Sequence, residues 1–223
     1  KTHFVSTYFS FGVALALGRM SSDQMQELGR IAQQYGSNDI RLTDWQTPLI
    51  LGVPDTKDAV VKTELEKIGL SAEANSFAAG AVACTGKWAC KLALAYTKQD
   101  ALSIVHHLQE RFTLDSPINI HLTGCPNSCA QHYIGDIGLV GTTAPGGGEG
   151  YNIVIGGGSD TDQGLARPLC GPVPAGSINE ILEHVVGCYV AKRAEGQTFL
   201  DFTRSLPDQD LPSLLPKQLA AAE

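Results

Sequence analysis

Residues 123–131 read Thr-Gly-Cys-Pro-Asn-Ser-Cys-Ala-Gln and are the most informative stretch of the chain. The apolar run before them is typical of a buried strand, which Gly124 would end. Cys125 and Cys129 lie four positions apart, so on a helix their sulfurs lie on one face, one turn from each other. Pro126 predicts that a helix begins there, because proline is favoured as the first helical residue. We therefore expect a strand-to-helix junction with a thiolate pair at the positive helix end, where negative charge is stabilised.

A second cysteine pair lies upstream in residues 83–92, which read Ala-Cys-Thr-Gly-Lys-Trp-Ala-Cys-Lys-Leu. Cys84 and Cys90 also follow a small apolar segment, and a break is expected at Gly86. A predicted helix over 98–112 separates the two pairs, so the two junctions can bring four thiolates to one point. Four cysteines suit an iron–sulfur cluster or zinc. Spacing alone does not decide between these two, nor against ordinary buried cysteines.

The two motifs together resemble the paired signature of siroheme-dependent nitrite and sulfite reductases. The matching parts are Cys-Thr-Gly-x3-Cys-x-Leu-Ala and Thr-Gly-Cys-Pro-Asn-Ser-Cys-Ala. The resemblance implies a 4Fe–4S cluster held by Cys84, Cys90, Cys125 and Cys129. It also implies that Cys129 bridges the cluster to the siroheme iron, which makes it the catalytic cysteine. The continuation Gly-Asp-Ile-Gly-Leu at 135–139 resembles the nitrite branch more than the sulfite branch.

The same resemblance implies a reaction, the six-electron reduction of nitrite to ammonia, one electron at a time. Electrons would pass from the cluster through Cys129 to the siroheme iron, with the anion on the opposite face. Asn127 is carried over as a siroheme contact. Ferredoxin or a flavoprotein is the implied electron donor. Sulfite reduction on the same scaffold is the first alternative. A module that binds an iron–sulfur cluster or zinc without siroheme is the alternative that is not an enzyme.

Three lysines are the only charged residues between positions 84 and 98: Lys87, Lys91 and Lys98. Such a run is usually a solvated helix face. Beside the carboxylates of siroheme, Lys87 and Lys91 would instead serve as counter-charges. The family commonly has glycine after its second cysteine, so Lys91 is a departure from its pattern.

Residues 1–75 predict a small unit with the order β-α-β-β-α. Its first helix would be capped by Ser21 or Ser22 and end at Gly36. Strands are expected at 40–43 and 48–53, and a second helix from Pro54-Asp55 to Gly69. The expected inward residues of the first helix are Met25, Leu28, Ile31 and Ala32.

This order resembles the ferredoxin-like half-domain of the same family, most specifically in Leu-Gly-Arg-Met-Ser and Arg-Leu-Thr-x-Trp-Gln. The name describes topology only. The resemblance places Arg41, Thr43 and Gln46 against the siroheme cavity or its pseudo-symmetric twin. Ordinary polarity of a strand edge and loop is the alternative for these three residues.

The predicted fold class is therefore α+β, with three segments. A ferredoxin-like half-domain (1–75) precedes a siroheme and 4Fe–4S domain (76–205) and a proline-punctuated tail (206–223) that wraps the surface or is loose. Further strands are expected at 137–140 and 151–155, and a helix at 178–191. The resemblance implies that this is only the C-terminal copy of a pair. A homologous N-terminal half, or a second copy of the chain, would then complete the site.

Composition excludes several classes of protein. The chain has 223 residues, 43% of them hydrophobic, which supports a full core. A net charge of −7 argues against a nucleic-acid partner. The apolar stretch 4–17 is too short and too interrupted to span a bilayer, so we expect strand and loop there and no membrane. Six cysteines do not form a secreted disulfide pattern, which favours a reducing compartment: the cytoplasm, or the plastid stroma of a eukaryote.

Other candidate features have simpler interpretations. The glycine runs at 146–148 and 156–158 lack the context of a phosphate-binding loop and are expected to be hairpin turns. Cys170 and Cys188 have no partner at ligand spacing and are expected to be small buried hydrophobic residues. For His121 and His132, a packed role is favoured over proton transfer.

Overall fold

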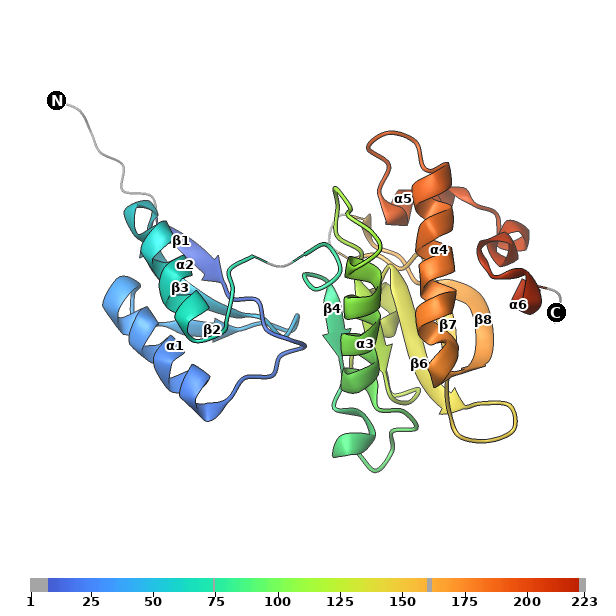
Figure 1. The fold of residues 1–223 in the computed structure, drawn as a ribbon, viewed down its shortest axis with the longest axis horizontal. Helices are drawn as coiled ribbons and strands as arrows, with labels where there is room; N and C mark the ends of the chain where they lie inside the picture. Colours follow the sequence, from blue (N-terminus) through green and yellow to red (C-terminus); the bar gives the residue numbers. More distant parts are fainter. Residues whose placement is uncertain (1–7, 74, 160–161, 221–223) are drawn as a thin grey trace. The chain divides into compact units, whose positions relative to one another are not determined.

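The structure is a computed structural model that describes residues 8–73, 75–159 and 162–220. The chain folds as two compact units, Lys1–Ala74 and Asn75–Glu223 (Figure 1). No helix among the described residues is both long enough and apolar enough to cross a membrane.

The first unit packs two helices on a three-stranded antiparallel sheet whose strand order is β1-β3-β2. Figure 1 shows the two helices side by side over one face of this sheet. The predicted order β-α-β-β-α is confirmed. The elements are β1 (Tyr8–Gly12), α1 (Ser22–Tyr35), β2 (Ile40–Leu42), β3 (Pro48–Pro54) and α2 (Asp58–Lys67).

Helix α1 begins as the sequence predicts. Ser21 accepts a hydrogen bond from the Gln24 backbone N–H, and the Gln24 side chain accepts from the Ser21 N–H, which forms a capping box. Leu28, Ile31 and Ala32 are buried, as expected from their helical spacing. The prediction for Met25 is wrong, since its side chain is 61% exposed and lies in the first turn, outside the buried core cluster.

The second unit is a five-stranded mixed sheet with the order β4-β5-β6-β7-β8. β4, β5 and β6 run parallel, whereas β7 and β8 continue the sheet antiparallel. Figure 1 shows α3 and α4 beside each other on one side of this sheet. The elements are β4 (Ala81–Ala83), α3 (Thr97–Gln109), β5 (Ile120–Thr123), β6 (Ile137–Thr143), β7 (Glu149–Ile155), β8 (Arg167–Pro174), α4 (Ile178–Lys192), α5 (Phe199–Ser205) and α6 (Lys217–Ala220).

Three of these elements, β8, α5 and α6, were not predicted. The glycine run 146–148 forms the predicted turn between β6 and β7, with positive φ at all three residues. The run 156–158 is different, because it leads into the long connection from β7 to β8 and bridges to Gly164 rather than turning a hairpin.

The tail after residue 206 is packed onto the second unit. Its 3-10 helix η6 (Asp208–Leu214) contacts β8 and α4. Leu211, Leu214 and Leu215 are buried, with at most 4% exposed. Cys170 and Cys188 are partly exposed rather than buried, which corrects the sequence prediction.

Candidate functional site

The two cysteine segments leave the sheet at neighbouring strand ends. β4 and β5 are parallel partners, with Ala83 opposite Leu122. The Cys84 backbone N–H donates to the Leu122 carbonyl at 3.0 Å, which continues the ladder by one residue. The carboxyl ends of parallel strands meet at one edge of a sheet, where ligands bind in open α/β sheets. Both cysteine loops therefore start at the same edge.

A direct hydrogen bond joins the two segments. The Gly124 backbone N–H donates to Sγ of Cys84 at 3.1 Å, and the Gly124 carbonyl accepts from Leu94 N–H at 2.7 Å. A Cβ at Gly124 would lie 2.8 Å from the Cβ of Ala93 and 3.5 Å from the Cys84 sulfur. On its other side, a Cβ at Gly141 would lie 2.5 Å from the Gly124 oxygen. Close approach therefore favours glycine at 124, against Ala93, and at 141, against the Gly124 carbonyl.

The helix predicted at Pro126 does not form, and residues 124–131 contain bends and two short turns, at 126–127 and 129–130. Ser128 and Gln131 have φ of +58° and +54°, in the left-handed region that a right-handed helix excludes. β5 and β6 are parallel neighbours, so this segment is their crossover, a connection that is more often helical. Here the left-handed backbone at Ser128 and Gln131 interrupts any helix. Only a short 3-10 helix, η3 (His132–Ile134), forms within the crossover.

Buried groups fix this crossover. Thr123 is fully buried, and its hydroxyl accepts from the Ala130 N–H at 3.2 Å. The Nδ1 of His121 lies 3.0 Å from the Gln131 carbonyl, and that of His132 lies 3.0 Å from Oγ of Ser128. Burial lowers the pKa of both histidines, which favours their neutral forms. These contacts agree with a packed role for both histidines.

The loop from Cys84 to Cys90 is compact as well. Gly86 has φ +66° and opens the short 3-10 helix η2 (Gly86–Trp88). The Cys90 N–H donates to the Gly86 carbonyl at 3.0 Å, and the Lys87 N–H donates to Ala95 at 2.9 Å. The break predicted at Gly86 is therefore present, although the turn is 3-10 rather than α.

The four motif cysteines differ in exposure. Cys125 is 8% exposed, Cys84 and Cys90 are partly exposed, and Cys129 is exposed; all are free thiols. Within the described ranges, no three His, Cys, Asp or Glu side chains converge tightly enough to hold a single metal ion. In a 4Fe–4S cluster each thiolate binds a different iron, so its ligands are spread more widely than those of one ion. Two adjacent cysteine loops joined by an N–H···S hydrogen bond fit such a cluster.

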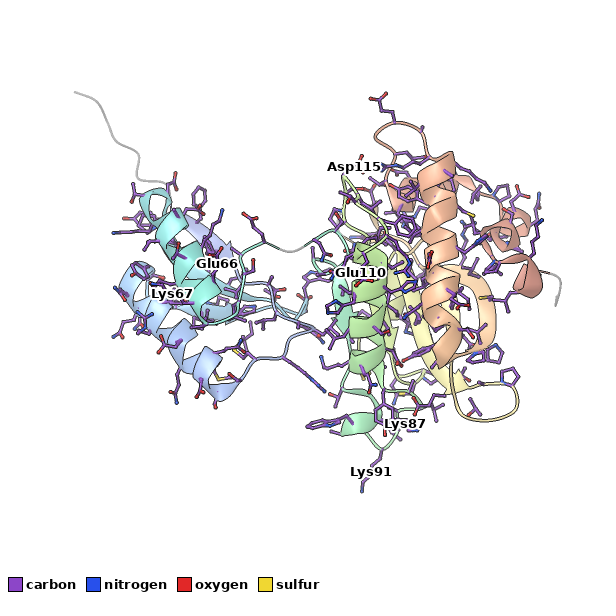
Figure 2. The ribbon with its side chains drawn as sticks, in the orientation of Figure 1. Glu66, Lys67, Lys87, Lys91, Glu110 and Asp115 are labelled. Carbon is purple, nitrogen blue, oxygen red and sulfur yellow. The ribbon has the colours of Figure 1, made fainter. Side chains whose placement is uncertain are left out.

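The two predicted cofactor lysines lie on this loop, and Figure 2 shows them at the same end of the second unit. Lys87 Nζ lies 2.8 Å from Oε1 of Glu149 and 5.3 Å from the centre of the Tyr96 ring. The hydrogen bond to Glu149 raises the Lys87 pKa. Lys91 is exposed, as is Asn127 in the other loop. The third lysine, Lys98, donates to the Ala83 carbonyl at 3.0 Å.

The other predicted residues belong to the first unit, where local structure accounts for them. Arg41 binds Asp39 through Nε and Nη2, at 3.1 and 3.0 Å. The Thr43 hydroxyl donates to the Thr47 carbonyl at 2.7 Å and closes the turn between β2 and β3. Gln46 lies in that turn with φ +60°. A role for Arg41, Thr43 and Gln46 at a cofactor stays a prediction.

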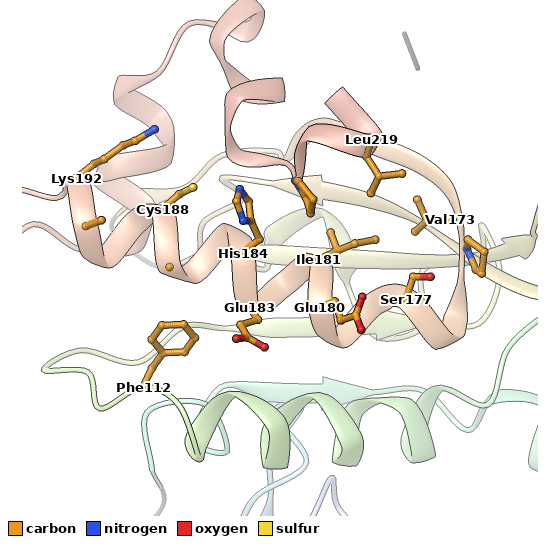
Figure 3. A pocket seen from close by; sticks show the side chains of 14 residues that line it. Phe112, Val173, Ser177, Glu180, Ile181, Glu183, His184, Cys188, Lys192 and Leu219 are labelled. Carbon is orange, nitrogen blue, oxygen red and sulfur yellow. The ribbon is translucent and has the colours of Figure 1, made fainter. Parts of the chain in front are cut away.

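A well-formed groove lies elsewhere in the second unit, along α4 (Figure 3). Its volume is about 750 Å³, and it lies between α4, the residue Phe112 that follows α3, and the C-terminal segment. Its lining mixes apolar and charged side chains, among them Ile181, Glu183, His184 and Leu219. None of the predicted site residues lines it.

The fold and the two cysteine loops at neighbouring parallel strand ends define an α+β protein with a candidate thiolate-ligated metal site, and comparison with known proteins gives the family. Residues 76–198 match the nitrite and sulphite reductase 4Fe-4S domain, and residues 5–68 match the nitrite/sulfite reductase ferredoxin-like half domain. The chain belongs to the nitrite and sulphite reductase family.

The relatives that are similar to the chain include both sulfite reductases and nitrite reductases. It is 34% identical over 210 residues to sulfite reductase (ferredoxin) 2 of Mycolicibacterium paratuberculosis, covering 90% of this chain and 38% of that protein. It is 36% identical over 197 residues to the chloroplastic ferredoxin–nitrite reductase of Spinacia oleracea, covering 83% and 33%. The chain thus spans about a third of the length of these relatives.

Solved structures agree on the fold. The Mycobacterium tuberculosis NirA protein is 31% identical, with a TM-score of 0.81 over 90% of this chain and 38% of that one. Dissimilatory sulfite reductase I matches with a TM-score of 0.78 over 95% of this chain and 71% of that one. Its identity is 10%, so this second match concerns the fold alone.

Proposed function

We propose that this chain is the cluster-bearing half of a siroheme-dependent nitrite or sulfite reductase. The observation that carries the proposal is the hydrogen bond from Gly124 N–H to the Cys84 sulfur, which joins the two cysteine loops at one sheet edge. Cys84, Cys90, Cys125 and Cys129 would hold the 4Fe–4S cluster. Membership of a family whose matched region is a 4Fe-4S domain supports the same assignment.

Cys129 would have a second role. It is exposed, whereas Cys125 is buried. A thiolate shared by two metal centres has to be accessible to both, and this exposure supports Cys129 as the bridge to siroheme. When bound, siroheme would supply the iron that takes the anion and passes on electrons received through the bridge.

The remaining residues would bind and orient siroheme. Asn127 is exposed in the same loop as Cys129, and Lys91 is exposed in the neighbouring loop. Lys87 would have to exchange Glu149 for a siroheme carboxylate. Arg41, Thr43 and Gln46 would act from the ferredoxin-like half-domain.

Nitrite is the proposed substrate, with sulfite as the alternative. The sequence at 135–139 favours nitrite, while relatives with either substrate in their names are 31–36% identical. Ferredoxin is the proposed electron donor because it appears in the names of both kinds of relative. The chain would work in a reducing compartment, either cytoplasm or plastid stroma.

Reconstitution tests the proposal. The chain is purified without oxygen, supplied with iron, sulfide and siroheme, and assayed for bound metal, absorption spectrum, and nitrite and sulfite turnover with a reduced dye as donor. We expect about four irons in the cluster and a broad visible absorption. A colourless protein that binds zinc would contradict the proposal. If the protein bound a cluster but no siroheme, even with a homologous half present, the alternative of an iron–sulfur binding module that is not an enzyme would be favoured.

A further inference from the structure

The first residue of α3 lies against the first cysteine. Thr97 is fully buried, although it follows Cys84 by 13 positions. Its hydroxyl donates to the Cys84 carbonyl at 2.7 Å, and the same Oγ1 lies 3.6 Å from the Cys84 sulfur. One side chain therefore contacts both the backbone and the sulfur of Cys84.

The chain around Thr97 is shaped to allow this contact. A Cβ at Gly86 would lie 2.5 Å from Oγ1 of Thr97 and 2.8 Å from its backbone nitrogen, so only glycine leaves room. Lys98, the next residue of α3, donates to the Ala83 carbonyl at 3.0 Å. Thr97 and Lys98, which are consecutive in α3, thus bind the carbonyls of Cys84 and Ala83, where β4 ends and the cysteine loop begins.

We propose that Thr97 is a positioning residue for Cys84. By holding the Cys84 carbonyl, it keeps the sulfur 3.1 Å from the Gly124 N–H donor. The inference rests on the proposed function, because it concerns Cys84 as a cluster ligand. Thr97 lies outside the cysteine motifs, yet it would set the position and hydrogen bonding of the Cys84 sulfur.

The expected consequence is electrochemical. Reduction adds one electron and makes no bond, so the negative charge shared by the ligand sulfurs increases. A hydrogen bond to a sulfur stabilises the more negative, reduced form and raises the reduction potential. A hydroxyl has a single proton, and in the structure it lies on the carbonyl side of Cys84. Thr97 therefore acts mainly by keeping Cys84 aligned with Gly124.

The test compares three variants of the cluster-bearing protein. Thr97→Val removes the hydroxyl and keeps the side-chain shape, Thr97→Ser keeps the hydroxyl, and Thr203→Val is the matched control. Thr203 is also fully buried, and its hydroxyl donates to a carbonyl, that of Leu200, at 3.0 Å in α5. The readout is the midpoint potential of the cluster, from a redox titration followed by electron paramagnetic resonance.

We expect Thr97→Val to lower the potential by about 59 mV, a tenfold change in the one-electron equilibrium. Thr97→Ser and Thr203→Val should both stay near the wild-type value. Equal potentials for Thr97→Val and Thr203→Val would overturn the inference while the cluster assignment stands. A wild-type chain that binds no cluster would overturn the proposed function and this inference together.

A second measurement serves if Thr97→Val assembles too little cluster for titration. In cluster-free protein, the alkylation rate of Cys84 is compared with that of Cys90 by mass spectrometry. Both residues are partly exposed, so Cys90 is an internal reference. We expect the Cys84 to Cys90 ratio to rise severalfold in Thr97→Val alone. An unchanged ratio would overturn the positioning role.

Discussion

Oδ2 of Asp136 accepts a hydrogen bond from the backbone N–H of Asn119 at 2.7 Å, which ties the residue before β6 to the residue before β5. The Ile137 N–H also donates to the Asn119 carbonyl, at 3.0 Å. Asp136 is 5% exposed. The strands that carry the second cysteine loop are thus fixed at their starts by a buried carboxylate. Burial raises the pKa of Asp136 to about 6, although the Asn119 hydrogen bond and the charge of Arg204 oppose this shift.

A pH dependence of stability follows from Asp136. Its ordinary pKa of 3.8 applies to the unfolded chain, so between about pH 4 and 6 the folded state binds the proton more tightly. The contribution of Asp136 to stability therefore falls as pH rises through this window and is constant above it. Asp136→Asn keeps an acceptor for Asn119 without the charge. Between about pH 4 and pH 6, we expect the unfolding free energy of Asp136→Asn, relative to that of wild type, to increase by roughly 3 kcal/mol.

Denaturant unfolding of the cluster-free protein between pH 4 and 8 measures this difference. Asp210→Asn, at an exposed position in η6, is the control and should show little change across the same range. A stability difference between Asp136→Asn and wild type that does not vary with pH would contradict the prediction.

The cysteine assignment predicts two classes of variant. Cys84→Ser, Cys90→Ser and Cys125→Ser should each lose or degrade the cluster, because a hydroxyl rarely replaces a thiolate on iron. Cys170→Ser and Cys188→Ser are the controls and should keep it, with a modest loss of packing. Iron and acid-labile sulfide per chain provide the measurement. Full iron content in any of the first three variants would remove that residue from the ligand set.

Cys129 should behave differently from the other three ligands. If its sulfur is the bridge, replacement by serine should change the siroheme spectrum as well as the cluster signal. The other replacements should alter the siroheme spectrum only to the extent that cluster is lost. Absorption and electron paramagnetic resonance spectra of the same samples separate the two effects. A siroheme spectrum untouched by Cys129→Ser would rule out the bridging role.

Gly124→Ala should be destabilising, because its new Cβ would lie 2.8 Å from the Cβ of Ala93, against packed backbone and side chain. Overpacking of this kind typically costs about 1–3 kcal/mol. Gly187→Ala in α4 is the matched control, because its Cβ would meet only a ring atom of Phe112 at 3.9 Å. Alanine is favoured over glycine inside a helix by roughly 1 kcal/mol, so the control should be stabilised. Thermal unfolding distinguishes the two variants. An unchanged unfolding temperature for Gly124→Ala would show that the two cysteine loops can move apart at little cost in stability.

Much of the fold follows from local signals in the sequence. The start of α1 is specified by the Ser21 and Gln24 capping box, and β5 by its apolar run before Gly124. The ferredoxin-like order and the cofactor-domain family were both predicted from motifs and are confirmed. In these cases, neighbours within a few positions determine the structure.

Features that depend on distant partners were not predicted. Pro126 and the cysteine spacing favour a helix locally, but Ser128 and Gln131 are left-handed. The β5 side chains Thr123 and His121 hold the segment in another conformation. The contact between Thr97 and Cys84 likewise depends on how α3 packs beside β4. The edge strand β8 is interrupted by Pro168 and Pro172, which obscures the usual strand pattern.

The last prediction concerns the completeness of the siroheme site. Siroheme carries about eight carboxylates, and an unpaired buried charge costs several kcal/mol. The chain has 16 Lys and Arg residues against 23 Asp and Glu. Many of these cations already bind the protein's own carboxylates: Arg30, Arg41, Lys62, Lys67, Lys87, Arg111, Arg167 and Arg193.

We therefore expect the chain alone to bind siroheme weakly and to need cationic side chains from a partner surface. A homologous N-terminal half is the partner we expect, because the family resemblance implies that this chain is one copy of a pair. Size-exclusion chromatography with light scattering, combined with siroheme counted per polypeptide, tests this. Siroheme retained at one per complex of the two halves would support the homologous half, whereas one per pair of identical chains would favour a second copy. A monodisperse monomer that holds one siroheme and reduces nitrite would show that no partner is needed.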